Sequence, residues 1–177
     1  MFKKILLLLV VGLAGLAVYV ATQPDHFRIE RRATVNAPPQ AVFTQVNDFS
    51  KWDDWSPWAK LDPNSKIAFE GPQAATGAVF KWSGNDKVGE GKMTVVESKP
   101  NDAVRLKVDF VKPFEGTSNS DFAFKPEGDG TAVTWTMSAH HNFIEKAFCL
   151  VMNGKKMIGD DLENGLAQMK ALAEQKS

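Results

Sequence analysis

Three tryptophans recur at every third position, at Trp52, Trp55 and Trp58. Indole is rigid and amphipathic, so this segment suits the rim of a binding site that is apolar on one side and wet on the other. Beside a bilayer, the same side chains would favour the membrane interface. The alternative is a connection that its tryptophans pin to the core. The spacing therefore predicts an aromatic cluster that serves as ligand rim, membrane contact or core packing.

Imidazole groups are scarce, and two of the three are the adjacent His140 and His141. Neighbouring residues of a strand point to opposite faces, and alternation from Trp135 places His141 on the apolar face. There it could act as an acid or base at the end of a cavity. The alternative is that His140, His141 and Asn142 form a corner at the protein surface or cap the start of the helix that follows. We expect no metal site, because neither a cysteine nor another histidine joins the pair at ligand spacing.

Two further groups could take part in chemistry. Ser120 shares a strand face with Phe122, so its hydroxyl could fix one ligand oxygen or simply bond within the protein. Cys149, the only cysteine, lies in an apolar helical stretch where we expect a buried, inert thiol. Nucleotide-binding, zinc-protease and serine-hydrolase motifs are absent from the sequence, so we expect no cofactor.

The elements that position these groups follow from periodicity. Alternation from Phe27 to Val35 predicts a strand, and Pro38-Pro39 precedes a short helix that reaches about Asn47. Runs of strand type separated by turn residues then predict an antiparallel meander. These runs are Lys66–Glu70, Gly77–Ser83, Gly89–Ser98, Ala103–Lys112, Thr117–Lys125 and Thr131–His140. Each is expected to turn one apolar face toward the core.

The end of the chain has helical periodicity from Asn142 to about Glu174. Its apolar stripe should lie on the concave face of the sheet. Gly154, Gly159 and Gly165 interrupt it, and each costs roughly 1 kcal/mol relative to alanine inside a helix. Either they enlarge a cavity, or they mark a helix break near Asn153 or close packing.

The chain begins with an apolar leader. Lys3 and Lys4 precede a run in which 15 of the 17 residues from Ile5 to Ala21 are apolar. A membrane anchor, a cleavable signal peptide and a core helix all fit that pattern, and we favour the anchor because a good cleavage site is missing. We therefore divide the chain into an anchor at 1–22, a tether at 23–26 and one domain at 27–175.

The two leading lysines predict an inside N-terminus, whereas Arg28, Arg31 and Arg32 on the other flank count against that orientation. We expect a single-pass protein of a bacterial inner membrane with a periplasmic domain. The chain carries 21 basic and 21 acidic side chains, so it has no broad basic field for nucleic acid.

Several segments, together with the order strand, helix, six strands, long helix, carry a family resemblance. They are Asn47–Trp52, Trp55–Trp58, Trp82–Asn85, Gly89–Gly91 and Met157–Leu166. The sequence resembles the polyketide cyclase/dehydrase branch of the START-like (Bet v 1-like, SRPBCC) superfamily. The resemblance implies an α+β helix-grip fold, in which a curved seven-stranded antiparallel sheet wraps a long C-terminal helix around a deep cavity. Members bind lipids, sterols, polyketides or plant hormones, and a minority are enzymes.

From this resemblance we expect a membrane-tethered domain that binds a hydrophobic small molecule, a lipid or a polyketide- or isoprenoid-like species. The alternatives are a cyclase, dehydratase or hydrolase that uses His141 or an aspartate as acid or base, and an interaction module whose cavity is filled. The residues expected to contact the ligand are Trp52, Trp55, Trp58, Phe80, Trp82, Phe110, Ser120, Phe122, Trp135, His141, Phe148, Gly154 and Met157.

Overall fold

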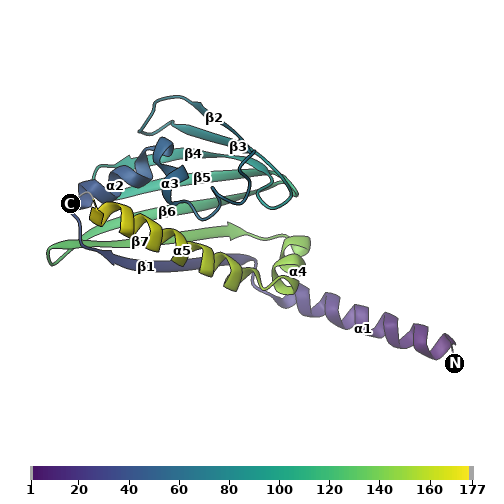
Figure 1. Ribbon diagram of the computed structural model, residues 1–177. Coiled ribbons are helices and arrows are strands. Elements are labelled where there is room, and N and C mark those ends of the chain that lie inside the picture. Colours follow the sequence, from purple (N-terminus) through teal and green to yellow (C-terminus); the bar gives the residue numbers. More distant parts are fainter. Residues whose placement is uncertain (1, 176–177) are drawn as a thin grey trace.

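A computed structural model describes residues 2–175, and over this range the chain forms a long N-terminal helix followed by an α+β domain (Figure 1). The helices are α1 (Phe2–Thr22), α2 (Pro39–Asn47), α3 (Trp52–Trp55), α4 (Phe143–Val151) and α5 (Gly154–Gln175), and one turn of 3-10 helix spans Phe49–Lys51. The strands are β1 (His26–Val35), β2 (Lys66–Glu70), β3 (Val79–Ser83), β4 (Glu90–Lys99), β5 (Ala103–Lys112), β6 (Gly116–Glu127) and β7 (Gly130–His140). The expected fold class is confirmed, and the strand bounds agree with the sequence pattern to within about two residues.

The strands form one antiparallel sheet in the order β1-β7-β6-β5-β4-β3-β2. β2 to β7 follow one another as hairpins, whereas β1 joins the last strand, with Ile29 opposite Met137. The ends of the strands therefore form two loop clusters. One, here called the anchor end, holds the start of β1, the end of β7 and the β5–β6 turn, and α1 extends from it (Figure 1).

The C-terminal helical region is two helices rather than one. Asn142 begins α4 with a capping box, in which its side chain accepts from the backbone N–H groups of Ile144 and Glu145 while the Glu145 carboxylate accepts from the Asn142 N–H. The chain then turns at Asn153, whose φ of 49° is left-handed, and α5 begins at Gly154. The break near Asn153 is thus confirmed. α5 packs mainly on β1, so it covers one face of the sheet at the end where β1 lies (Figure 1).

Large aromatic side chains fill the centre of the domain. Trp55 and Trp135 are fully buried, and their rings meet edge to face. The indole N–H of Trp55 donates to the carbonyl of Gln45 at 3.0 Å, and that of Trp52 donates to Val46 at 2.8 Å. These bonds satisfy polar groups that would otherwise be costly to bury. The first two tryptophans of the repeat therefore pin the α2–α3 segment onto the sheet.

α1 is 21 residues long and apolar enough to cross a membrane by length and composition. Most of its surface is exposed, but Val20 in its last turn is buried. A helix of this kind near the N-terminus is either a membrane anchor or a signal sequence.

Candidate functional site

The space between the sheet and α5 is where the fold class would place a ligand, and its middle is occupied by packed side chains. Trp52, Trp55, Phe122 and Trp135, four of the residues expected to contact a ligand, are each no more than 2% exposed. Leu162, Leu166 and Met169 of α5 close the other side of this cluster and are equally buried. A ligand must therefore lie at the margins of this core.

The serines of β6 differ in a way that the sequence did not reveal. Ser120 is buried, and its hydroxyl accepts a hydrogen bond from the Trp135 indole at 2.9 Å, so it is already engaged in the core. Ser118, two residues earlier on the same face, is 8% exposed. Within residues 2–175, its Oγ is the one buried side-chain polar atom without a hydrogen-bond partner. Such a group is unusual and points to a missing partner.

An aromatic strip lies on the same face of the sheet, beyond the area that α5 covers. It consists of Phe69, Phe80, Trp82 and Phe110, whose rings contact one another in series at centroid distances of 5.7, 6.1 and 6.0 Å. Phe69 is 58% and Phe110 is 36% exposed, although both point to the inner face. The two ends of the strip are therefore open to the surroundings, whereas Phe80 and Trp82 between them are partly buried against the core.

Two details fix the strip and connect it with Ser118. The Trp82 indole donates to the Val88 carbonyl at 2.9 Å, and its ring lies over Gly91, where an added Cβ would stand 2.6 Å from a ring carbon. Ser118 pairs with Val108 on β5, one inward-facing position from Phe110. The unpartnered hydroxyl and the exposed ring thus lie close together on the sheet.

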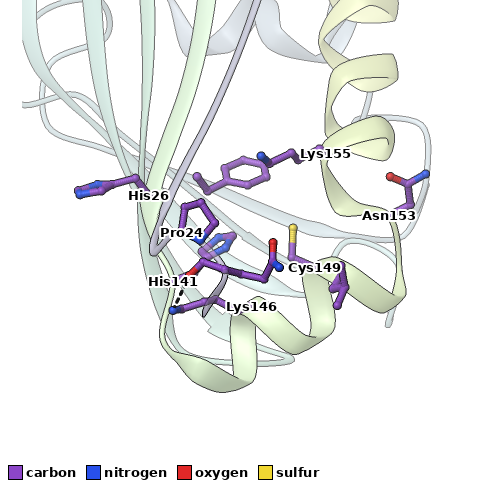
Figure 2. A pocket seen from close by; sticks show the side chains of 10 residues that line it. Pro24, His26, His141, Lys146, Cys149, Asn153 and Lys155 are labelled. Atoms are coloured by element: carbon purple, nitrogen blue, oxygen red, sulfur yellow. Dashed lines mark hydrogen bonds between the residues drawn. The ribbon is translucent and has the colours of Figure 1, made fainter. Parts of the chain in front are cut away.

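Two pockets flank this arrangement. A pocket of about 290 Å³ lies at the β2 side between Phe49, Phe69 and Val79. Another, of about 200 Å³, lies at the anchor end between β1, β7 and α4, where Figure 2 shows Pro24, His141 and Cys149 around it. Both are smaller than the roughly 300–1,000 Å³ typical of ligand cavities.

His141 is the predicted site residue in the anchor-end pocket. Its ring stacks on Phe27 at a centroid distance of 4.9 Å, and its backbone N–H donates to the Asp25 carbonyl at 2.8 Å. Burial lowers the pKa of the imidazole, and the nearby Glu145 carboxylate opposes this shift in part. A half-buried imidazole that favours its neutral form can donate or accept a hydrogen bond in the pocket. Cys149 lines the same pocket and is only partly buried.

Trp58 differs from the other two tryptophans of its repeat. It is partly buried, and its indole donates to the Asp161 carboxylate of α5 at 3.2 Å. Burial raises the pKa of Asp161, and the bond from Trp58 acts against that rise. Trp58 therefore links the tryptophan segment to α5.

The remaining predicted residues lie near α4. Phe148 and Met157 are 49% and 46% exposed, and Phe148 contacts Phe114 of the β5–β6 turn. Gly154 is buried at the α4–α5 junction, where an added Cβ would stand 2.7 Å from the Cys149 sulfur. Gly154 thus permits close packing of the two helices.

A possible ligand set for a metal ion forms at the edge between β1 and β7. Asp25, His26 and His140 each place one ligand atom within 4.8 Å of the others. Asp25 and His26 are adjacent in the sequence, and the β1–β7 register, which places His26 opposite His140, brings the distant His140 to them. All three are exposed, and such surface groups are common without a metal.

Sequence reasoning missed Ser118, Phe69 and Phe114. The alternation of β6 placed Ser118 on the correct face, but nothing in the sequence shows which of two serines Trp135 would engage. Phe69 and Phe114 lie in segments that the pattern assigned simply to a strand and a turn.

A curved antiparallel sheet with a helix across one face defines the helix-grip class, and the comparisons agree. Residues 26–174 match the family described as "Polyketide cyclase / dehydrase and lipid transport". The chain belongs to this family, and the family and fold suggest the binding of a hydrophobic ligand. A search among curated proteins finds no match.

Solved structures share the fold at low sequence identity. The di-domain aromatase/cyclase StfQ of the steffimycin biosynthetic pathway superposes with a TM-score of 0.64 at 13% identity, over 85% of this chain and 51% of that chain. Protein MLL2253 from Mesorhizobium loti gives a TM-score of 0.63 at 14% identity, over 85% and 99% of the chains. The Aha1 dimer from Colwellia psychrerythraea gives 0.58 at 18% identity, over 85% and 99%.

Proposed function

We propose that the protein is a membrane-tethered domain that binds a hydrophobic small molecule along the aromatic strip. The observation that carries this proposal is a series of aromatic rings on the inner face of the sheet whose two ends, Phe69 and Phe110, are exposed, on the face where the fold class would place a ligand. Folded proteins normally bury such side chains, so an uncovered strip indicates a surface that something else covers. α1 supplies the tether.

The contacts also indicate the chemistry of the ligand. The rings offer apolar area, and burying about 300 Å² of ligand surface contributes on the order of 7 kcal/mol before ordering costs. The buried Ser118 hydroxyl, which has no partner, lies one inward-facing position from Phe110, so a ligand that enters beside Phe110 would meet this single polar group. A long apolar molecule with one oxygen-bearing group, such as a fatty acid, an acyl chain or an isoprenoid, fits this combination.

The test uses the full chain in amphipol and cis-parinaric acid as the probe, with energy transfer from tryptophan as the readout. We expect saturable transfer that palmitic acid competes away. Phe110→Asp should weaken binding at least tenfold, because it places a charge in the strip. The matched control is Val96→Asp, at an exposed valine of β4 outside the strip, which should leave Kd unchanged. Transfer that does not saturate, or equal losses in both variants, would refute the proposal.

A cavity enzyme is the second candidate, and His141 is the observation that favours it. The imidazole is half-buried beside Phe27 in a pocket, and its lowered pKa favours the neutral form, which can accept a proton as a general base. If it catalyses hydrolysis, the full chain should cleave p-nitrophenyl acyl esters, and His141→Gln should abolish this activity without affecting parinarate binding. Absence of turnover with acyl chains from two to sixteen carbons would count against an esterase.

A further inference from the structure

α4 is an unusually apolar helix for its position. Over Phe143–Val151, all of which the structure describes, no residue is buried. Ile144 and Val151 are 68% and 78% exposed, and Phe148 and the adjoining Met152 are about half exposed. A water-facing surface helix normally carries polar residues on such positions.

The two sides of α4 have different surroundings. Lys146, Cys149 and Leu150 line the anchor-end pocket and so face the domain. Helical spacing places Ile144, Phe148, Val151 and Met152 together on the opposite side, at steps of four, three and one residues. We call these four residues the outward stripe. Phe114 extends the stripe, since its ring lies 5.9 Å from that of Phe148.

The two charged residues of α4 are engaged within the protein and leave the stripe apolar. Glu145 closes the capping box with the Asn142 backbone. Lys146 donates to the Gln23 carbonyl at 2.9 Å, the bond drawn as a dashed line in Figure 2. That bond joins α4 directly to the segment that follows α1.

α4 is held close to the end of α1. The two helices contact one another, and Val20 in the last turn of α1 is buried. Only three residues separate Thr22 from His26, where β1 begins, and the Asp25 carbonyl among them accepts a bond from the His141 N–H. Figure 1 shows α4 beside the point where α1 meets the domain. The position of α4 is therefore fixed relative to the anchor.

The length of α1 determines how deep its C-terminal end, beside α4, would lie in a membrane. A helix of 21 residues extends about 31 Å, close to the roughly 30 Å hydrocarbon core of a bilayer. If α1 spans the membrane, its last turn ends at the interface, and α4 beside it must lie at the same level. Two exposed lysines follow the stripe: Lys156 pairs with Asp160 of α5, and Lys155 lies at the anchor-end pocket, where its ammonium group suits lipid headgroups.

We propose that the outward stripe and Phe114 enter the interfacial layer of the same bilayer that holds α1, so that the protein contacts the membrane at two points. The inference rests on the anchor that is part of the proposed function. It assigns the membrane contact to α4 rather than to the tryptophan segment, whose first two rings are buried. It also turns the Phe110 end of the aromatic strip toward the lipid, because Phe110 and Phe114 belong to one hairpin.

The test places nitroxide labels on the full chain, in a Cys149→Ser background, in nanodiscs of phosphatidylcholine and phosphatidylglycerol. Single cysteines replace Ile144, Val151 or, as the control, Asp129 in the exposed β6–β7 turn at the opposite end of the domain. Labels at 144 and 151 should be more accessible to oxygen than to a water-soluble nickel chelate, and the label at 129 should show the reverse. If the labels at 144 and 151 behave like the one at 129, the proposal is wrong.

Further measurements distinguish a failure of the stripe proposal from a failure of the proposed tether. A label at Leu8 reports on the anchor: an aqueous environment there would refute the tether, whereas a hydrocarbon environment with aqueous 144 and 151 refutes only the stripe. Dipolar broadening between labels at 144 in the nanodiscs, which disappears when the labelled protein is diluted with unlabelled protein, would show that a second copy covers the stripe, which also refutes the proposal.

A charge variant provides the complementary test. Ile144→Glu/Val151→Glu should bring a label at Met152 into water, while the matched Val96→Glu should not. Both parent side chains are largely exposed, so the double variant should keep the unfolding midpoint of the parent. A label at Met152 that stays in lipid in the double variant would contradict the proposal.

Discussion

At the scale of single residues, neighbouring groups of the same type have different roles because the packing around them differs. Ser120 is bonded to Trp135, whereas Ser118 has a buried hydroxyl without a partner. Trp52 and Trp55 are core residues, whereas Trp58 bonds to α5. Alternation predicted the face of each residue, but not its hydrogen-bond partner, which comes from another strand or helix.

The serine pair gives a matched prediction on stability. Ser120→Ala should lower the free energy of unfolding by about 1–3 kcal/mol, because it leaves the buried Trp135 N–H without an acceptor. Ser118→Ala should be neutral or stabilising, since it removes a buried polar group that bonds to nothing. Urea unfolding of the full chain in detergent, followed by circular dichroism, measures both. Equal losses in the two variants would contradict the assignment.

His141 gives a prediction on pH dependence. Burial lowers its pKa in the folded state below the ordinary value of 6.5, so the unfolded chain takes up the proton first as the pH falls. Stability should therefore decrease with falling pH in the window below 6.5 and be unaffected by this group above it. His141→Gln should flatten that part of the stability profile. An unchanged slope between pH 6.5 and 5 would show that the imidazole does not matter there.

At the scale of elements, glycines decide how closely α5 approaches the sheet. At Gly165 an added Cβ would stand 2.7 Å from the Trp135 ring and 3.0 Å from Pro57. At Gly159 the nearest group is the guanidinium of Arg31, which pairs with Glu163 at 2.5 Å. The sequence left open whether these glycines enlarge a cavity, and the contacts show that both allow close packing.

This difference predicts that the same substitution, glycine to alanine, changes the stability of the protein much more at position 165 than at position 159. Gly165→Ala should destabilise the protein by about 1–3 kcal/mol, because rigid neighbours leave no room for a methyl group. Gly159→Ala should stay within about 1 kcal/mol of the parent, since the arginine can move and alanine favours the helix. Thermal unfolding of the two variants, side by side, tests the prediction. A tolerated alanine at 165 would mean that Trp135 can shift.

At the scale of the whole molecule, the domain is joined to α1 by a short segment that is bonded on both sides. The bond from Lys146 to Gln23 and that from His141 to Asp25 hold this segment, which follows α1, against the folded domain. Cleavage after Ala21 would keep Gln23 and Asp25 but would remove Val20, which is buried, and the contacts between α1 and α4. In line with the proposed tether, we predict that α1 is retained.

The mass of the mature protein shows whether α1 is retained. Protein extracted from membranes with detergent should have the full 19.5 kDa of the chain and should resist release by alkaline carbonate. By length and composition, α1 is able to cross a bilayer, which is why we expect it to hold the protein in the membrane fraction. A smaller mass that begins after Ala17 or Ala21, together with release into the soluble fraction, would establish a cleaved signal instead.

The sequence by itself determined the elements, their order and the inward face of each strand. Period-two alternation from Phe27 to Val35 and in the later strands, the turn residues and the helical stripe are local patterns, and hydrophobic burial translates them into structure directly. The N-terminal apolar helix was also predicted from the sequence, because its length and composition alone are those of a helix that can span a membrane.

Only the tertiary structure decided which of the predicted residues remain available for a ligand. Long-range packing buried Trp52 and Trp55, engaged Ser120 and left Phe110 exposed, and these outcomes depend on contacts between residues far apart in the chain. It also decided that α4 lies beside α1 with its apolar side outward. A helical stripe indicates that something covers it, but whether that is a sheet or a membrane depends on where the fold places the helix.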